Sequence, residues 1–330
     1  MKRIKISFLF FIISFFLNKS EIYSQIKKDS TYYYYQLLKN PKEENDLIST
    51  YLYFVKQKEL SLKNGDTTKA IISLRYIASL ENKLGAFYDS ESSAVKALNL
   101  LKDKDEIDSR IGLYNHIGMV NRTLKNYDNA LFYYNKLLLI TKTQKQSMAA
   151  YNNRGIVYQY QKKYNAAIEE FKKAYQISSL LGDSLKIARS LDNLGYSQSK
   201  IGIDSGYLNM KRALIIRKKI NKISELYPSY KHLTSYFLQK KDTKKAFKYA
   251  SKSYEIAKKI NSPTYIIDAL SNLSNLSNDK LFYEYKNLTD SISIAKQLKE
   301  NKFASIKYDF NEQKKIANEN KIEQEKQKRL

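Results

Sequence analysis

Small or hydroxyl-bearing residues recur along the chain at nearly constant intervals, and this register constrains the fold more than any other feature of the sequence. The intervals between them are 40, 37, 40, 39 and 40 residues. The six positions are Ala78, Gly118, Gly155, Gly195, Thr234 and Ser274. A repeat of this length accommodates one pair of antiparallel helices, and a single pair cannot bury its own apolar face. The register therefore predicts an all-α solenoid of about six stacked helix pairs.

The segment 151–178, YNNRGIVYQYQKKYNAAIEEFKKAYQIS, shows the pattern inside one pair. Apolar and small residues recur at three-to-four spacing on both sides of the polar turn KKYN, as in two successive amphipathic helices. A glycine inside a helix costs about 1 kcal/mol relative to alanine. Gly155 therefore predicts a close approach of the second helix, with Ala167 as the matching small surface. The expected helix-packing residues are Gly118, Ala130, Gly155, Ala167, Phe171, Ala174, Gly195, Ala213 and Ala246.

The connections between helix pairs follow the same register. Thirteen residues before four of the small positions stand residues that tolerate the left-handed conformation that ends a helix. They are Gly65, Gly182, Asn221 and Asn261. In NGDTT, LGDS and INS an Asp or Ser comes next, and we expect it to cap the following helix. Nine glycines and three prolines in 330 residues leave little material for a turn-rich β fold.

These residues, and YNNRGIVYQYQKKYNAAIEEFKKAY above all, resemble the tetratricopeptide repeat (TPR) family. The resemblance covers about residues 67–290 and implies a right-handed superhelix of antiparallel helix pairs. It departs most in the unit of Ser274, where Lys286 stands at a position expected to be small. We expect a degenerate capping helix pair at 25–66, the TPR array at 67–290, and a charged C-terminal helix or coiled-coil-like tail at 291–330.

The N-terminus has the layout of a secretory signal peptide over residues 1–24. MKRIK is basic, ISFLFFIISFFL is apolar, and NKSEIYSQ is polar, with cleavage expected after Ser24. The apolar run is short for a membrane span, which needs about 20 residues, so an uncleaved anchor is the alternative. The chain has no cysteine, which excludes a lipid-modified cysteine and disulfides. We expect a periplasmic or secreted protein.

The sequence contains no recognisable catalytic, metal-binding or cofactor-binding motif. Without cysteine there is no thiol chemistry and no Cys-ligated zinc, and His116 and His232 are far apart in the chain. The formal net charge of +25 comes from lysines scattered through every segment, not from one stretch. Most tyrosines fall at helix-packing positions, which disfavours a nucleic-acid platform. We therefore expect no enzyme activity, no cofactor, no metal and no nucleic-acid partner.

A polar column lies two residues before each small position of the first helices. Its members are Tyr76, His116, Asn153, Asn193, His232 and Asn272. Helical spacing places this column on a face turned away from the packing stripe. The TPR resemblance implies that this face lines a concave groove, where Asn153 and Asn193 match the family's peptide-holding asparagine. The expected groove residues are Asn115, His116, Arg122, Asn152, Asn153, Arg189, Asn193, Lys200 and His232. Alternatively, the same amides tie adjacent repeats together.

The sequence favours a non-catalytic TPR scaffold that binds a protein or peptide, with the basic charge favouring an acidic ligand. The signal peptide, TPR array and charged C-terminal helix also resemble extracytoplasmic sensor regions of bacterial histidine kinases and helix-turn-helix regulators. That resemblance implies a second hypothesis, in which the C-terminal helix contacts a membrane-bound signalling partner. An enzyme with an unrecognised site is the third. The sequence does not identify the ligand.

Overall fold

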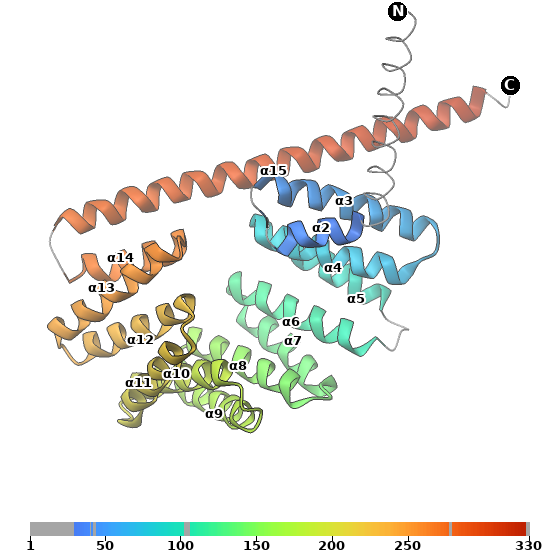
Figure 1. Cartoon of the computed structure of the whole chain (residues 1–330). Helices are drawn as coiled ribbons and strands as arrows, with labels where there is room; N and C mark the ends of the chain where they lie inside the picture. Colours follow the sequence, from blue (N-terminus) through green and yellow to red (C-terminus); the bar gives the residue numbers. More distant parts are fainter. Residues whose placement is uncertain (1–29, 40, 42–43, 102–105, 277–278, 328–330) are drawn as a thin grey trace, which may run out of the picture. The chain divides into compact units, whose positions relative to one another are not determined.

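The structure is a computed structural model (Figure 1) and describes residues 30–39, 41, 44–101, 106–276 and 279–327. The signal peptide expected at 1–24 lies outside these residues. Within the described ranges every regular element is a helix, and none is a strand. The all-α architecture predicted from the register is therefore confirmed. None of the described helices is both long enough and apolar enough to cross a membrane.

The helices follow one another in antiparallel pairs, and the chain divides into two compact units after Leu100. The first unit contains α2 (Ser30–Lys39), α3 (Glu44–Lys63), α4 (Thr67–Leu84) and α5 (Phe87–Leu100). The second unit contains α6 (Ile107–Thr123), α7 (Tyr127–Ile140), α8 (Gln144–Tyr160), α9 (Tyr164–Leu180), α10 (Ser184–Lys200), α11 (Ser205–Ile220), the short 3-10 helix η1 (Ile223–Glu225), α12 (Leu226–Gln239), α13 (Thr243–Lys259), α14 (Pro263–Ser274) and α15 (Asp279–Gln327).

In the first unit, aromatic side chains join the α2–α3 pair to the pair that follows it. The rings of Tyr34 and Tyr53 stack with their centroids 4.1 Å apart, which ties α2 to α3. Phe54 is buried, and its ring centroid lies 4.5 Å from that of Tyr76 on α4. Such aromatic pairs add about 0.5 to 1.5 kcal/mol beyond the area that they bury. These contacts hold α2 and α3 against the α4–α5 pair.

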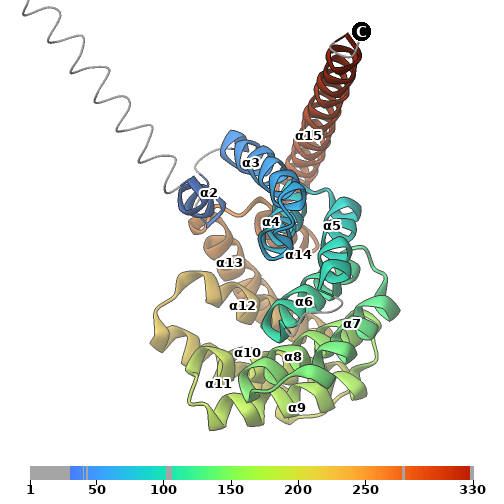
Figure 2. The ribbon, with the colours of Figure 1, turned by 90° about the vertical axis from the view of Figure 1, so that its right-hand side faces the viewer.

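In the second unit the helices from α6 to α14 form a curved stack (Figures 1 and 2). The first helices of successive pairs, α6, α8, α10, α12 and α14, touch one another in that order. Comparable contacts between successive second helices are absent from the described residues. Closer spacing on one side of a stack bends it toward that side. The first helices therefore form the inner layer of this unit, and the second helices form the outer layer.

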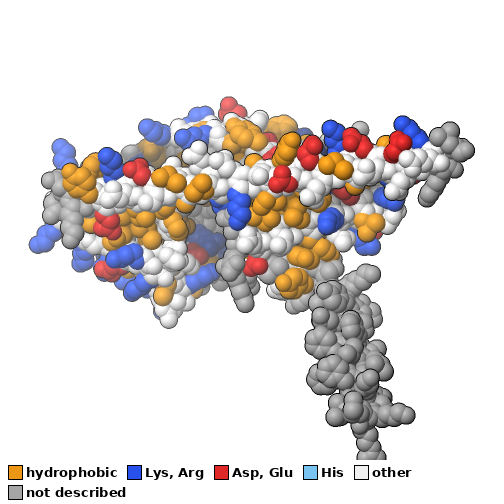
Figure 3. Space-filling view, turned by 90° about the horizontal axis from the view of Figure 1, so that it is seen from above, with side chains coloured by type: hydrophobic (Ala, Val, Ile, Leu, Met, Phe, Trp, Pro, Cys, Tyr) orange, Lys and Arg blue, Asp and Glu red, His pale blue; other side chains and the backbone are white. Residues whose placement is uncertain are grey.

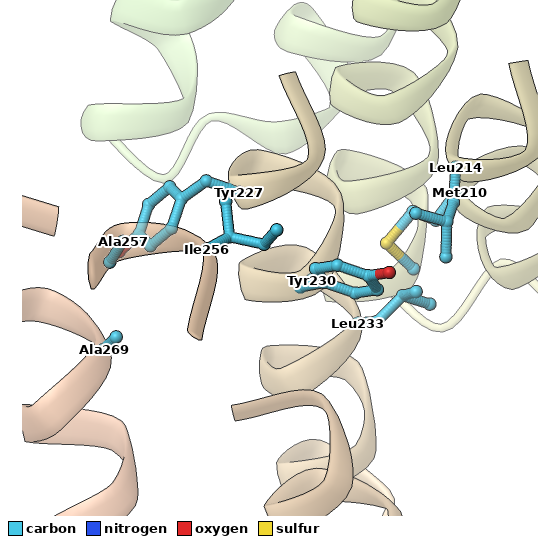
Figure 4. Close-up of a cluster of buried hydrophobic side chains, with 8 residues drawn as sticks. All are labelled: Met210, Leu214, Tyr227, Tyr230, Leu233, Ile256, Ala257 and Ala269. Atoms are coloured by element: carbon cyan, nitrogen blue, oxygen red, sulfur yellow. The ribbon is translucent and has the colours of Figure 1, made fainter. Parts of the chain in front are cut away.

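A continuous apolar core passes from one pair to the next, and Figure 4 shows one section of it. Met210 and Leu214 of α11 share this section with Leu233 of α12 and Ala269 of α14. The remaining members are Tyr227, Tyr230, Ile256 and Ala257. Four helices from three pairs thus contribute to one cluster, which explains why a single pair is not a stable unit.

The small residues of the register lie where helices approach closely. A Cβ atom added to Gly155 would stand 2.6 Å from the ring of Phe171, and one added to Gly195 would stand 2.6 Å from the backbone oxygen of Gly206. Phe171, not Ala167, is therefore the immediate neighbour of Gly155. The alanine and phenylalanine packing residues are fully buried: Ala130, Ala167, Phe171, Ala174, Ala213 and Ala246. Gly118 meets the ring of Tyr134 in the same way.

The predicted left-handed residues between the pairs are confirmed. Positive φ angles occur at all four positions: Gly65, Gly182, Asn221 and Asn261. Of the three predicted caps, Asp66 accepts a hydrogen bond from the Lys69 N–H, and Asp183 accepts one from the Lys186 N–H, each at 3.0 Å. The prediction is wrong for Ser262, which makes no such bond. Pro263 follows it as the first residue of α14, a position that proline favours because its fixed φ suits the start of a helix.

The last second helix and the charged tail form one element. α15 spans 49 residues and continues without a break across residue 290, the expected end of the TPR array. Its surface is strongly charged, with i,i+4 ion pairs such as Lys296–Glu300 and Lys321–Glu325. On the face drawn in Figure 3, Lys and Arg side chains are interspersed with Asp, Glu and hydrophobic ones. That face therefore carries no large patch of a single charge.

Candidate functional site

The inner layer of the second unit contains a hollow of about 540 Å³, which we call the inner hollow. All five first helices contribute side chains to it, so it extends across several repeats. Its lining residues are Arg122, Ile156, Gln159, Tyr160, Asn193, Tyr196, Tyr227, Pro228, Lys231, His232, Ser235, Tyr265, Asp268 and Asn272. A hollow that crosses successive repeats suits an extended ligand better than a compact one.

Stacked aromatic rings form much of the wall of the inner hollow. The rings of Tyr227 and Tyr265 are nearly parallel with their centroids 4.1 Å apart, and those of Tyr196 and His232 are 4.3 Å apart. Lys200 Nζ lies 5.1 Å from the centroid of the Tyr196 ring. Each stack joins neighbouring first helices, so the walls link successive repeats. The ring faces and edges supply apolar contact area, and the phenol groups supply polar contacts.

A carboxylate lies among these rings and is already engaged within the protein. Asp268 on α14 accepts a hydrogen bond from the Tyr227 hydroxyl, and Lys231 Nζ lies 2.9 Å from the same carboxylate oxygen. Burial and the bond to Asp268 both raise the pKa of Tyr227 above its usual value. Tyr227 is therefore a neutral donor at physiological pH. The pairing fixes α12 against α14 at one end of the hollow.

A buried ion pair between Asp192 of α10 and Arg217 of α11 contacts His232, which lines the inner hollow. Arg217 Nη1 lies 2.5 Å from Asp192 Oδ2 and 2.6 Å from Ser229 Oγ, and His232 Nδ1 lies 3.1 Å from the same Asp192 oxygen. The Asp192 side chain is 0% exposed. Burial raises the pKa of Asp192, but Arg217 and His232 outweigh it and lower that pKa to about 2. The carboxylate therefore stays charged and links Arg217 of the outer layer to His232 of the inner layer.

Two asparagines of the polar column, Asn153 and Asn193, hydrogen-bond to asparagines of the preceding repeat that stand one residue before the column position. Asn153 Nδ2 donates to Asn115 Oδ1 at 2.8 Å, and Asn193 Nδ2 donates to Asn152 Oδ1 at 3.1 Å. Gln159 adds a bond from its Nε2 to the Asn193 carbonyl. These bonds match the alternative in which the amides tie adjacent repeats together. An incoming peptide backbone would have to use the remaining hydrogen-bonding capacity of these amides.

The other expected groove residues fall at different places. Asn115, Asn152, Asn153 and Arg189 line a second, smaller hollow of about 210 Å³, and Arg189 Nε donates to Glu225 Oε2 at 3.1 Å. Arg122, Asn193 and His232 line the inner hollow. Lys200 Nζ donates to Ser235 Oγ at 2.8 Å, beside the inner hollow. His116 lines neither of these two hollows.

Sequence reasoning missed the residues that form most of the inner hollow's wall. Tyr196, Tyr227 and Tyr265 are expected from the sequence to serve helix packing, and Lys231 and Asp268 are not among the expected groove residues. A signal was present: Tyr, Lys and Ser recur at four-residue spacing at 227, 231 and 235. Such a stripe of polar and aromatic residues occupies one helical face. In the described part of the chain, no group of three or more His, Cys, Asp or Glu residues is arranged to hold a metal ion.

The partly buried His116 makes the stability of the array depend on pH. Burial lowers the pKa of His116 to about 4, below its ordinary value of 6.5. The fold favours the neutral imidazole, so this stabilisation is complete above pH 6.5 and is lost as the pH falls toward 4. We expect the free energy of unfolding to drop by about 3 kcal/mol from this group between pH 7 and pH 4.

Urea unfolding of the wild type and of His116→Asn at both pH values measures this contribution, because the other titrating groups are common to both proteins. The variant should lose less stability on acidification than the wild type. Equal losses in the two proteins would contradict the burial of a neutral His116.

Two family models match parts of this chain, and both describe a tetratricopeptide repeat. They cover residues 111–144 and 146–202. These ranges fall on α6 to α10, where the sequence resemblance is clearest. No curated protein matches the sequence.

Several solved structures share the fold. Aspartyl phosphate phosphatase F from Bacillus subtilis is 17% identical, with a TM-score of 0.59 over 80% of this chain and 73% of that one. The apo form of RapI is 17% identical, with a TM-score of 0.57 over 74% of this chain and 98% of that one. A Rap protein complexed with Competence and Sporulation Factor is 12% identical, with a TM-score of 0.54 over 79% and 78%. At these identities the likeness concerns the fold.

Proposed function

We propose that this chain, a helical solenoid that matches tetratricopeptide-repeat models over residues 111–144 and 146–202, is a non-catalytic scaffold whose inner hollow binds an extended peptide segment of a partner protein. The single observation that carries the proposal is the inner hollow itself, which all five first helices of the second unit line. An extended peptide contacts several repeats at once, as this arrangement requires. Export through the expected signal peptide, with a periplasmic or secreted location, belongs to the same proposal.

The chemistry of the wall indicates which side chains such a peptide would carry. Tyr160 is 61% exposed and Tyr265 is 38% exposed, so part of each ring remains open to a ligand. Arg122 and Lys231 bring positive charge to the hollow, and Asp268 offsets one of them. The hollow therefore favours peptides that combine an apolar or aromatic side chain with an acidic one.

The Rap protein complexed with Competence and Sporulation Factor supports the proposal by its fold. That protein shows that a helical stack of this kind is compatible with a bound partner. The present chain shares the fold at 12% identity, so the comparison does not extend to the residues of the site. The argument for binding at this position rests on the hollow and its aromatic walls.

Selection from a random peptide library against the full chain, followed by affinity measurement by calorimetry, tests the proposal. We expect selected peptides to bind the wild type, and the double variant Tyr265→Ala with Arg122→Ala to bind them at least about tenfold more weakly. The physical reason is the loss of one aromatic wall and one cation at the hollow. The affinity should fall while the helical circular dichroism stays unchanged.

The matched control is Tyr88→Ala with Lys172→Ala, which removes one exposed tyrosine and one exposed cation outside the hollow. Its affinity should stay close to that of the wild type. Equal binding by the hollow variant and the wild type would place the ligand elsewhere. A selection that enriches no peptide would contradict peptide binding altogether.

A further inference from the structure

Positive charge is concentrated on two helices of the outer layer, α11 and α13. α11 contains five Lys or Arg residues, of which Arg217 is buried against Asp192, and α13 contains six; Glu255 is the one acidic residue in these two helices. The charge of the other second helices is balanced: α7 has one lysine and one aspartate, and α9 has two lysines and two glutamates. The lysine-rich composition of the whole chain therefore does not account for this local excess.

An aromatic cluster brings the N-terminal halves of α11 and α13 together. The ring centroid of Phe237 on α12 lies 5.7 Å from that of Tyr207 on α11 and 5.5 Å from that of Tyr249 on α13. Lys211 Nζ lies 5.5 Å from the Tyr207 centroid, and Lys245 Nζ lies 5.2 Å from the Phe237 centroid. Lys211 of α11 and Lys245 of α13 thus lie over rings of one cluster, which joins the two helices through Phe237 of α12.

Large apolar side chains stand exposed among these cations. Leu208 is 60% exposed, Ile215 is 59% exposed and Phe247 is 43% exposed. On α11, Leu208, Arg212, Ile215 and Lys219 follow at helical spacing, so apolar and basic side chains alternate along one exposed stripe. On α13, Phe247 stands between the exposed Lys244 and Lys248. We call these residues of α11 and α13 the basic outer face.

We propose that the basic outer face docks the protein on the surface of an anionic lipid bilayer. Lysine and arginine side chains would contact anionic head groups, and the exposed Leu, Ile and Phe side chains would enter the interfacial region between them. Helices that combine many Lys and Arg residues with exposed apolar side chains are typical of the membrane-binding surfaces of peripheral proteins. The inner hollow belongs to the first helices and stays open, so the inference is independent of peptide binding.

The residue types on the face distinguish a bilayer from other acidic partners. Lysine is depleted in the cores of protein–protein interfaces, whereas here Lys244 and Lys248 flank Phe247, and Lys219 follows Ile215 on the α11 stripe. A single-stranded nucleic acid would need open aromatic faces for stacking. Phe247 is exposed, but the rings of Tyr207, Phe237 and Tyr249 are packed together, with Lys211 over Tyr207 and Lys245 over Phe237. The bilayer surface therefore fits these observations best.

Cosedimentation of the full chain with lipid vesicles tests the inference. The vesicles contain phosphatidylcholine alone or with phosphatidylglycerol at about 25 mol%. We expect binding to the anionic vesicles only, and weaker binding in about 0.5 M than in about 0.1 M salt. The fourfold variant Arg212→Gln, Lys219→Gln, Lys244→Gln, Lys248→Gln should reduce vesicle affinity at least about tenfold, because four charges near the surface are lost.

A control with the same change in net charge removes four exposed cations from other helices: Lys136→Gln, Lys145→Gln, Lys172→Gln and Lys173→Gln. Its vesicle affinity should remain within about twofold of the wild type. Leu208→Ser with Phe247→Ser should weaken the binding that persists at high salt. Selected peptides should bind the fourfold variant as they bind the wild type, which separates this inference from the proposed function.

Three results would overturn the inference. One is equal loss of vesicle binding in the fourfold variant and its control, which would indicate a net-charge effect. Another is the absence of binding to anionic vesicles in low salt. The third is binding of duplex DNA or of an acidic polypeptide that depends on the same four residues and exceeds vesicle binding. Because all four positions are exposed, unchanged helical circular dichroism confirms that the variants are folded.

Discussion

Replacing Asp192 with asparagine is expected to lower the free energy of unfolding by about 3 to 5 kcal/mol, because it leaves the buried Arg217 without its counter-charge. The Arg217 side chain is 3% exposed, so water does not compensate the lost carboxylate. His232 loses the same partner, and its stack on Tyr196 at the wall of the inner hollow becomes less constrained. We therefore expect peptide affinity to fall together with stability.

Urea denaturation followed by circular dichroism measures this effect, with two comparisons. Glu169→Gln breaks the exposed Lys172–Glu169 pair and should change stability by less than about 0.5 kcal/mol. The double variant Asp192→Leu with Arg217→Met removes both charges and should recover most of the stability that Asp192→Asn loses. A stability loss below about 1 kcal/mol in Asp192→Asn would contradict a tightly buried ion pair.

The Gly195→Ala variant is expected to lose about 1 to 3 kcal/mol of stability through overpacking. An added Cβ would meet the Gly206 carbonyl oxygen at 2.6 Å and the Met210 nitrogen at 2.9 Å, and both are backbone atoms of α11. Neither atom can move without separating α10 from α11. The sign of the change in the free energy of unfolding shows whether the close contact exists. At a helical site without close neighbours, the same substitution stabilises by up to about 1 kcal/mol.

Gly155→Ala provides the matched comparison. There the nearest atoms belong to the Phe171 ring, so Phe171→Leu should recover part of the stability that Gly155→Ala loses. No side-chain substitution should rescue Gly195→Ala, because its obstacles are backbone atoms. Thermal or urea unfolding of the two single variants and the Gly155→Ala, Phe171→Leu pair checks this. A stabilised Gly195→Ala protein would mean that α10 and α11 are farther apart than the structure shows.

The repeat register made the fold predictable from the sequence, since the small residues mark helix contacts that backbone sterics require. The register also marks a second set of positive φ angles, seven residues after the small positions, at Gly85, Lys125, Lys162, Gly202 and Lys241. Three of these residues are lysines, and lysine, unlike glycine or asparagine, is not a residue type that indicates a left-handed conformation in a sequence. The closing hydrogen bonds of the turn and the packing of both helices offset the cost of that conformation.

The candidate site was less predictable, for reasons that Asn153 and Tyr227 illustrate. Helical spacing correctly placed Asn153 on a polar face, but spacing alone does not show that its amide bonds to Asn115 of the preceding repeat. Tyr227 packs in the core, as its position in the sequence suggests, but its hydroxyl also reaches Asp268 on α14. Both hydrogen bonds, Asn153 to Asn115 and Tyr227 to Asp268, depend on the distance between the first helices of successive pairs. That distance depends on how the whole stack curves.

Photocrosslinking of a selected peptide tests most directly whether the inner hollow is the binding site. The peptide carries one benzoylphenylalanine, and mass spectrometry locates its adducts on the full chain. The account predicts adducts on the first helices α8, α10, α12 and α14, at residues beside Tyr196, Lys231 or Tyr265, and their loss in the Tyr265→Ala, Arg122→Ala variant. Adducts confined to the second helices, or unchanged in that variant, would contradict it.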